Sequence, residues 1–434
     1  MFTLDVRSLA LMRIAVAATV LADLGYRAVH LTEHYTDDGV LPRETARGLS
    51  WIADASLLAV SGSPLWAGLV FAVAAALAVA TLVGFRTRIA TPLLWLAMLS
   101  IQHRDPLLWD HRDVLFSASL CCGALLPWGD AFSVDARGRG AARTYTGAPA
   151  ALYVVQLACI YLFAALLKDG PEWRSDFTAV ERAISVEYWA RPAAHALLDH
   201  PSLAAALTAG VLVFEAALAP LLLSPWRTAL VRWIAVAGLC ALQVGFFVFL
   251  WLDTFPMIAA AMTLGLVPSS AWSRPAVAVV DRSRRRSGLA CALIVYVVAL
   301  NLASLHAEPG GVARAPAELL GLRQNWSMFA PSPSRLDGWF LVLARDRDGA
   351  TSDLLTGRGD DLRARPASFR EGIRTTRELV YMRRLLSAAP AARESFAAAR
   401  CRTGDASIAV YFVPVVDGAI GPRELLVERA CAQR

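Results

Sequence analysis

Long apolar runs constrain this chain more than any other feature of its sequence. Several of them approach the roughly 20 consecutive apolar residues that an α-helix needs to cross the hydrocarbon core of a bilayer. The chain of 434 residues is 56% hydrophobic and only 18% charged, a balance that soluble domains rarely have. The sequence therefore predicts a polytopic integral membrane protein.

Nine apolar segments are candidate membrane spans, although some are short. They are residues 9–29, 65–85, 89–103, 111–126, 151–168, 203–223, 230–252, 254–268 and 289–305. The first holds Arg13 and Asp23 and is followed by no clear cleavage site, so we interpret it as a retained helix and not as a signal peptide. The predicted fold class is an all-α membrane bundle of about nine transmembrane helices, formed by residues 1–306.

Arginines between the apolar runs predict the orientation. If the N-terminus is cytoplasmic, the loops after the second, fourth, sixth and eighth spans also face the cytoplasm. These loops carry arginines such as Arg88, Arg137, Arg227 and Arg282, as cytoplasmic loops usually do. Nine spans then place the C-terminus outside. The net charge of +6 is explained by these loops, so no nucleic-acid partner is expected.

Residues 307–434 are more polar and predict a small extracytoplasmic α+β domain. Residues 339–344 (WFLVLA) and 408–416 (IAVYFVPVV) predict strands, and residues 378–400 predict a helix that breaks at Pro390. Cys401 and Cys431 lie in this tail, where an oxidising compartment would allow them to pair. The other five cysteines lie in apolar runs, where cysteine usually behaves as a small hydrophobic residue. We find no Cys or His spacing of a metal site and expect no metal.

Lys168 is the first candidate for chemistry. It is the only lysine among the 42 basic residues, and it ends the fifth span on the predicted outer side, where a cation is disfavoured. Lysine at a membrane edge usually just extends its amine to water. Arginine cannot lose its proton in a protein, whereas a desolvated lysine can, so a site that needs a neutral amine cannot accept arginine. Asp169, Glu172 and Trp173 follow closely. We predict that Lys168 is a catalytic base.

Other ionisable residues lie within or beside the spans. Arg13, Asp23 and Arg27 lie in the first span, where a charge costs roughly 3 kcal/mol or more. Asp23 and Arg27 are four residues apart and can pair on one helical face. Structural pairing is the first interpretation and a substrate cavity between helices the second. Glu215, within the sixth span, has the same two interpretations.

His111 is the second candidate for proton transfer. It follows Asp110 at the outer end of the fourth span, and histidine exchanges protons readily near neutral pH. The simpler interpretation is that His111 is a polar residue at the membrane interface without a catalytic role. The segment Asn325 to Pro333 (NWSMFAPSP) follows the last span, and we interpret it as a rigid connector that docks the tail on the membrane.

The opening segment, LDVRSLALMRIAVAATVLADLGYR followed by HYTDDGVLPR, resembles the HTTM family (horizontally transferred transmembrane domain), which includes the vitamin K-dependent γ-carboxylases. NWSMFAPSP is similar to a segment that follows the last span in bacterial members, and the resemblance covers roughly residues 1–335. WDHRDVLF and Ser133-Val134-Asp135 resemble carboxylase stretches, the first of which holds a functional histidine at the position of His111. LLKDGPEW resembles the carboxylase segment in which a tryptophan follows a lysine at the Lys168–Trp173 spacing.

The resemblance implies a bacterial inner-membrane enzyme in which Lys168 deprotonates a reduced quinone (vitamin K hydroquinone or menaquinol). O2 and CO2 would be the co-substrates, and the acceptor a group such as a peptide glutamate. Arg13, Asp23, Arg27, Asp110, Trp173 and Glu215 are the candidate quinone-binding residues.

Two features depart from the carboxylases. Leu167 stands where they have a second lysine, and this tail is far shorter than their lumenal region. The alternative is a non-catalytic membrane factor that matures or exports a secreted peptide. Lipids, a quinone and an exported peptide are the expected partners.

Overall fold

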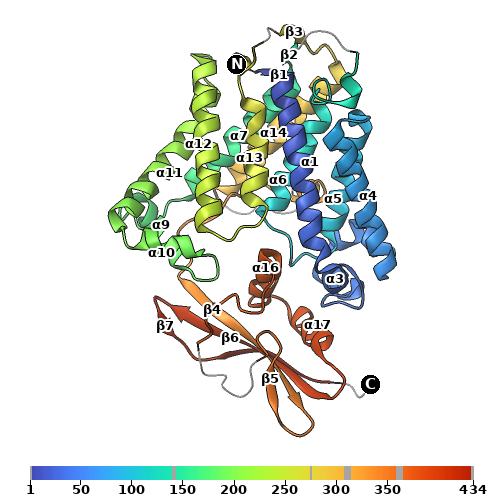
Figure 1. The fold of residues 1–434 in the computed structure, drawn as a ribbon, viewed down its shortest axis with the longest axis vertical. Coiled ribbons are helices and arrows are strands. Elements are labelled where there is room, and N and C mark those ends of the chain that lie inside the picture. The colour runs from blue at the N-terminus through green and yellow to red at the C-terminus, as the bar shows by residue number, and fades with distance from the viewer. Residues whose placement is uncertain (1, 139–142, 274–275, 307–313, 358–364, 432–434) are drawn as a thin grey trace.

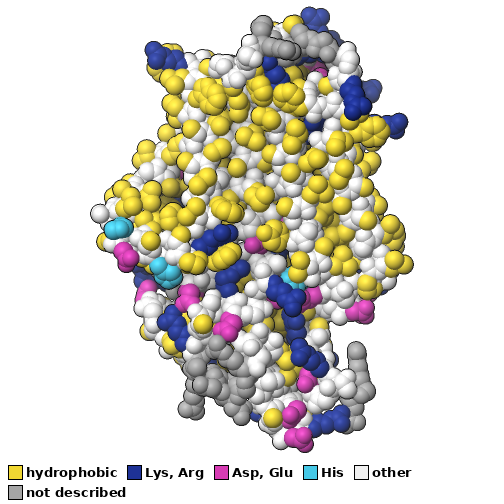
Figure 2. Space-filling model, viewed as in Figure 1, with side chains coloured by type: hydrophobic (Ala, Val, Ile, Leu, Met, Phe, Trp, Pro, Cys, Tyr) yellow, Lys and Arg dark blue, Asp and Glu magenta, His cyan; other side chains and the backbone are white. Residues whose placement is uncertain are grey.

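The computed structural model describes residues 2–138, 143–273, 276–306, 314–357 and 365–431. Six helices in these ranges are long and apolar enough to cross a membrane: α1 (Val6–Ala28), α4 (Pro64–Val83), α7 (Ala148–Leu167), α11 (Pro201–Leu222), α12 (Thr228–Phe249) and α14 (Arg284–Ser304). On the face shown in Figure 2, hydrophobic side chains cover the helical part, while charged side chains gather at its upper edge and over the C-terminal part. This distribution is that of a membrane protein.

Three further helices lie where spans were predicted but are shorter: α5 (Thr87–His103), α6 (His111–Leu125) and α13 (Phe255–Thr263). They have 17, 15 and 9 residues. At about 1.5 Å per residue, helices of 15 and 9 residues do not traverse a core of about 30 Å. The nine predicted segments therefore coincide with helices, but nine membrane crossings are not confirmed.

The two most buried candidate spans form the centre of the bundle (Figure 1). α1 packs against α4 and α13, and α7 packs against α11 and α14. The peripheral helices expose large apolar side chains such as Leu65 and Val295, as lipid-facing helices do. Short helices connect these elements: α2 (Leu31–Tyr35), α3 (Arg43–Leu49), α8 (Pro171–Arg174), α9 (Ala179–Ser185), α10 (Pro192–Leu198) and α15 (Arg314–Leu319).

One end of the bundle carries a three-stranded sheet that the sequence did not predict. Its order is β1 (Thr3–Asp5), β2 (Arg143–Thr146) and β3 (Val277–Val280). The arginine-bearing loops gather at this end: Arg232 donates to the Thr3 carbonyl oxygen at 2.6 Å, and the Arg86 backbone N–H donates to Asp135 at 2.8 Å. The C-terminal region lies at the opposite end (Figure 1).

The C-terminal region contains the predicted strands, which pair in an antiparallel sheet. β4 (Leu336–Asp346) and β6 (Asp405–Val416) pair at its centre, flanked by β5 (Thr351–Asp353), β7 (Ala419–Ile420) and β8 (Glu424–Ala430). The predicted helix is two helices, α16 (Thr376–Leu385) and α17 (Pro390–Arg400), separated just before Pro390.

Strand β4 is buried on both faces, which explains why its sequence is continuously apolar. Phe340 packs with Tyr381 of α16 in the main core, whereas Trp339 packs on the other face with Tyr188. Cys401 and Cys431 form a disulfide with their Cα atoms 5.7 Å apart, which ties the end of α17 to the end of β8. The predicted domain boundary, 306/307, borders residues 307–313, which lie outside the described residues.

Candidate functional site

Lys168 and Glu215 form an ion pair in the interior of the protein. Lys168 ends α7, Glu215 lies within α11, and the Lys168 amine is in hydrogen-bond contact with the Glu215 carboxylate. Each residue is only 4% exposed. The Lys168 nitrogen also lies 4.9 Å from the centre of the Trp173 ring, a cation–π distance. The amine therefore has a carboxylate and an aromatic face as neighbours.

The chain turn after Lys168 fixes its position. Helix α7 stops because Gly170 and Pro171 follow, and Pro171 begins α8. Arg174 then donates to the carbonyl oxygens of Lys168 at 2.9 Å and Ala165 at 3.0 Å. These bonds satisfy carbonyl groups that a helix end leaves without partners, so the backbone that carries Lys168 is held from both sides.

Two cavities meet at Lys168. The larger has a volume of about 450 Å³ and extends between the bundle and the C-terminal region. The smaller, of about 340 Å³, lies among α9, α11 and α12. Of the described residues that line the smaller cavity, only Lys168 is charged. Lys168 and Phe329 line both cavities, so one amine faces an apolar compartment and a second compartment that also contains ionisable side chains.

Polar side chains concentrate in the larger cavity. Those of ionisable or amide type are Asp110, His111, Arg112, Tyr161, Lys168, Glu215, Gln243 and Arg384. Arg384 comes from α16 of the C-terminal region, so both parts of the chain build this cavity. Burial lowers the pKa of the Arg384 guanidinium below its usual value, and the carboxylates of Asp110 and Asp113 oppose that shift. A cation in such a position attracts an anionic ligand.

The segment after the last span forms part of this site. The Gly170 N–H donates to the Pro331 carbonyl at 3.1 Å, and the Trp173 indole donates to the Phe329 carbonyl at 2.8 Å. The Ser332 hydroxyl donates to Glu172, and this hydrogen bond lowers the pKa of the Glu172 carboxyl. The segment predicted as a connector thus docks directly on the Lys168 turn and lines its larger cavity.

Asp110 and His111 stand at the start of α6. The Asp110 carboxylate accepts the Arg112 N–H at 2.8 Å as a helix cap, and Arg112 also pairs with it at 2.6 Å. The half-buried His111 lines the larger cavity, with its ring centre 6.5 Å from that of Trp326. The structure thus brings Asp110, His111, Lys168 and Glu215 to one cavity, with Trp173 on the adjoining one.

Asp23 and Arg27 line neither cavity. Arg27 pairs with Asp23 at 2.6 Å and contacts Asp113, while Arg377 of α16 pairs with Asp23 at 2.8 Å and Asp113 at 3.1 Å. All four are almost completely buried. The charges of the two carboxylates and the two guanidinium groups therefore compensate one another. The sequence favoured a structural pair of Asp23 and Arg27, and the structure adds Arg377 of the C-terminal region to it.

Arg13 lies elsewhere in α1. Its guanidinium donates to the carbonyl oxygens of Trp128 at 3.2 Å and Phe132 at 2.5 Å, in the loop after α6. It lines neither cavity, and it satisfies backbone groups of that loop.

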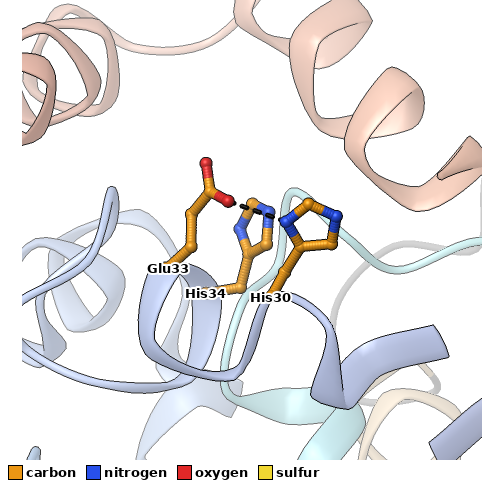
Figure 3. A group of neighbouring side chains, drawn as sticks. All are labelled: His30, Glu33 and His34. Carbon is orange, nitrogen blue, oxygen red and sulfur yellow. Dashed lines mark hydrogen bonds and ion pairs between the residues drawn. The ribbon is translucent and has the colours of Figure 1, made fainter. Parts of the chain in front are cut away.

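Two groups of residues at or near the site were not predicted from the sequence. Arg377 and Arg384 lie in a polar tail rich in arginine, and no local signal distinguishes them. His30, Glu33 and His34 also come together, with ligand atoms within 4.8 Å of one another (Figure 3). Their His-x-x-Glu-His spacing, known from zinc enzymes, was readable in the sequence.

A family model described as an HTTM domain matches residues 3–272. The match covers more than half of the chain and includes Lys168, His111 and Glu215, but not the C-terminal region. No curated protein matches the chain, and no solved structure does.

Proposed function

The chain belongs to the HTTM family, which is related to the vitamin K-dependent carboxylases, and we propose that it is a membrane enzyme that oxygenates a quinol and uses the product to carboxylate an acceptor. The site lies at the end of the bundle that carries the C-terminal region. We propose that this end faces the outside of a bacterial inner membrane, since the arginine-bearing loops lie at the other end.

The observation that carries the proposal is the position of Lys168 between two cavities, one lined almost entirely by apolar side chains and one that also holds ionisable side chains. A quinol is an apolar molecule of the bilayer, and the smaller cavity among α9, α11 and α12 suits its ring. The acceptor and CO2 arrive from water, and the larger cavity beneath the C-terminal region, with its ionisable side chains, suits them. One amine then contacts both reactants.

Lys168 and Glu215 act as one acid–base unit. Once the pair has given up a proton, the neutral Lys168 amine takes the phenolic proton of the quinol, and the Glu215 carboxylate stabilises the ammonium that forms again. The quinol and O2 supply the driving force: together they become quinone epoxide and water, while an acceptor C–H bond is replaced by a C–carboxylate bond. His111 assists proton transfer or stabilises negative charge in the larger cavity.

The acceptor carries a carboxylate, such as a glutamate side chain of an exported peptide. Arg384 supports this assignment because it is a partly buried cation on the wall of the larger cavity. A guanidinium presents its N–H groups in the geometry that a carboxylate accepts.

The proposal is tested with the whole chain purified in detergent, supplied with reduced menaquinone or vitamin K and O2. Epoxide is quantified by chromatography and mass spectrometry for the wild type and for Lys168→Ala. We expect epoxide from the wild type alone. Equal epoxide from both proteins would remove Lys168 from the mechanism. Folded wild-type protein that forms no epoxide would contradict the enzyme assignment and favour a non-catalytic factor for maturation or export of a peptide.

A further inference from the structure

A second cluster of chemically reactive side chains lies apart from the Lys168 cavities, where the bundle meets the C-terminal region. His30, Glu33 and His34 are close together in and just before α2 (Figure 3). His30 and His34 are four positions apart in the sequence, so they present their rings on one face of the turn. The three ligand atoms lie within 4.8 Å of one another.

Two histidines in this cluster are buried without full hydrogen bonding. His30 is 7% exposed and His34 is 3% exposed. Neither ring nitrogen of His34 has a hydrogen-bond partner among the described residues, and neither has Nε2 of His30. Buried polar atoms are normally paired, so three such atoms in one place indicate a ligand.

Two carboxylates from outside α2 also lie close to these histidine rings. The Asp105 carboxylate lies 3.5 Å from Nδ1 of His34, and the Glu378 carboxylate of α16 lies 3.7 Å from Nε2 of His30. One Asp105 oxygen has no hydrogen-bond partner among the described residues. Arg400 contacts the other side of Glu33 and leaves Oε2 directed at His30. Among the described residues, three carboxylates and one guanidinium thus lie in or contact the cluster, while the Arg104 and Arg384 guanidinium groups also act electrostatically on Asp105. The charged groups in direct contact with the two histidines are therefore carboxylates, which favours a cation.

We propose that His30, Glu33 and His34 bind a divalent transition-metal ion of the Zn²⁺ type, with Asp105 or Glu378 as a further ligand. Two imidazoles select such a metal over Mg²⁺ or Ca²⁺, which prefer oxygen ligands. Zinc bonds of about 2.1 Å require ligand atoms about 3.5 Å apart, so the side chains close by about 1 Å around the ion.

The metal stabilises the junction between the two parts of the chain. His30 and His34 belong to the bundle, whereas Glu378 and the Tyr381 ring, 4.9 Å from the His34 ring, belong to α16. Helix α16 also carries Arg384 into the larger cavity. The site is independent of the quinol chemistry, so metal binding and epoxide formation are separate measurements.

The test uses the full chain in detergent, purified without a histidine tag and stripped with EDTA. ZnCl2 is added, excess is removed, and bound zinc is measured by mass spectrometry together with the thermal unfolding midpoint. We expect about one zinc per chain and an increase of the midpoint by about 3 °C. The double variant His30→Gln/His34→Gln loses both effects, whereas the control His195→Gln/His200→Gln, at two exposed histidines, keeps them.

Binding of Co²⁺ to the wild type gives a further readout that requires no variant, because visible absorption of tetrahedral cobalt reports nitrogen and oxygen ligation. The proposal is overturned if the folded wild type retains less than about 0.1 zinc per chain. It is also overturned if the His30→Gln/His34→Gln variant binds as much zinc as the wild type.

Discussion

Lys168 and Glu215 lie 47 residues apart in sequence and meet in the interior of the protein. The sequence indicated Lys168 as a candidate because it is the only lysine. Glu215 was first interpreted as a structural residue. Their pairing could not be read from the sequence because no local pattern connects α7 and α11. A buried carboxylate beside an amine controls how readily that amine holds a proton.

Glu215→Gln tests this coupling at the residue scale. Glutamine keeps the size of the side chain but cannot carry the negative charge that stabilises the Lys168 ammonium. We expect epoxide formation to fall by about 10- to 100-fold. Adding Gln243→Glu to this variant would not restore epoxide formation, because Gln243 hydrogen-bonds Tyr161 and not Lys168. An unchanged rate in folded Glu215→Gln would show that the carboxylate has no part in the chemistry.

At the scale of elements, the apolar runs predicted the helices well because burial or lipid contact on every side leaves a long hydrophobic signal. The predicted segment 111–126 agrees with α6, whereas the predicted segment 254–268 is longer than α13, because the chain continues after Thr263 as a 3-10 turn over Leu264–Leu266. The strands β1, β2 and β3 have three or four residues, too few for a period-two pattern. The docking of residues 325–333 on the Lys168 turn depends on tertiary contacts and has no local signal.

Gly170→Ala tests that docking. A Cβ at Gly170 would lie 2.0 Å from the Ser332 hydroxyl and 2.8 Å from the Pro331 carbonyl oxygen, so the segment must move. We expect a loss of about 1–3 kcal/mol in unfolding free energy together with reduced epoxide formation. Gly68→Ala in α4 is the matched control, because nothing lies within 4 Å of its Cβ. If both variants behave alike, the docked segment does not shape the site.

At the scale of the whole molecule, the bundle and the C-terminal region are joined by a buried charge cluster. Arg377 lies 354 residues from Asp23, and their side chains are 2.8 Å apart. Together with Arg27 and Asp113 it forms a compensated set. The sequence predicted only the Asp23–Arg27 half, because the tail was expected to be a separate domain.

Arg377→Met removes one of the two cations from this cluster. Two buried carboxylates then share Arg27, and we expect a loss of about 3–5 kcal/mol, measured as a lower unfolding midpoint and faster proteolysis of the C-terminal region. Arg429→Met breaks an exposed pair with Glu394 and should cost less than about 1 kcal/mol. Similar losses from the two variants would argue against a structural role of the cluster.

The disulfide provides a test of orientation. If the C-terminal region is outside the membrane, Cys401 and Cys431 are oxidised in the native protein. Thiol labelling under denaturing conditions should count five reactive cysteines without reductant and seven with it. Seven reactive cysteines in both conditions would show that the disulfide does not form in the native protein, which would contradict an oxidising location for the C-terminal region.

The most direct measurement of the central claim is epoxide formation by Lys168→Arg. Arginine keeps a cation beside Glu215, so the ion pair and the fold persist, but it cannot give up its proton. We predict a thermal midpoint near that of the wild type and epoxide formation reduced by about 100-fold or more. A folded Lys168→Arg protein that forms epoxide at the wild-type rate would contradict the assignment of Lys168 as the base.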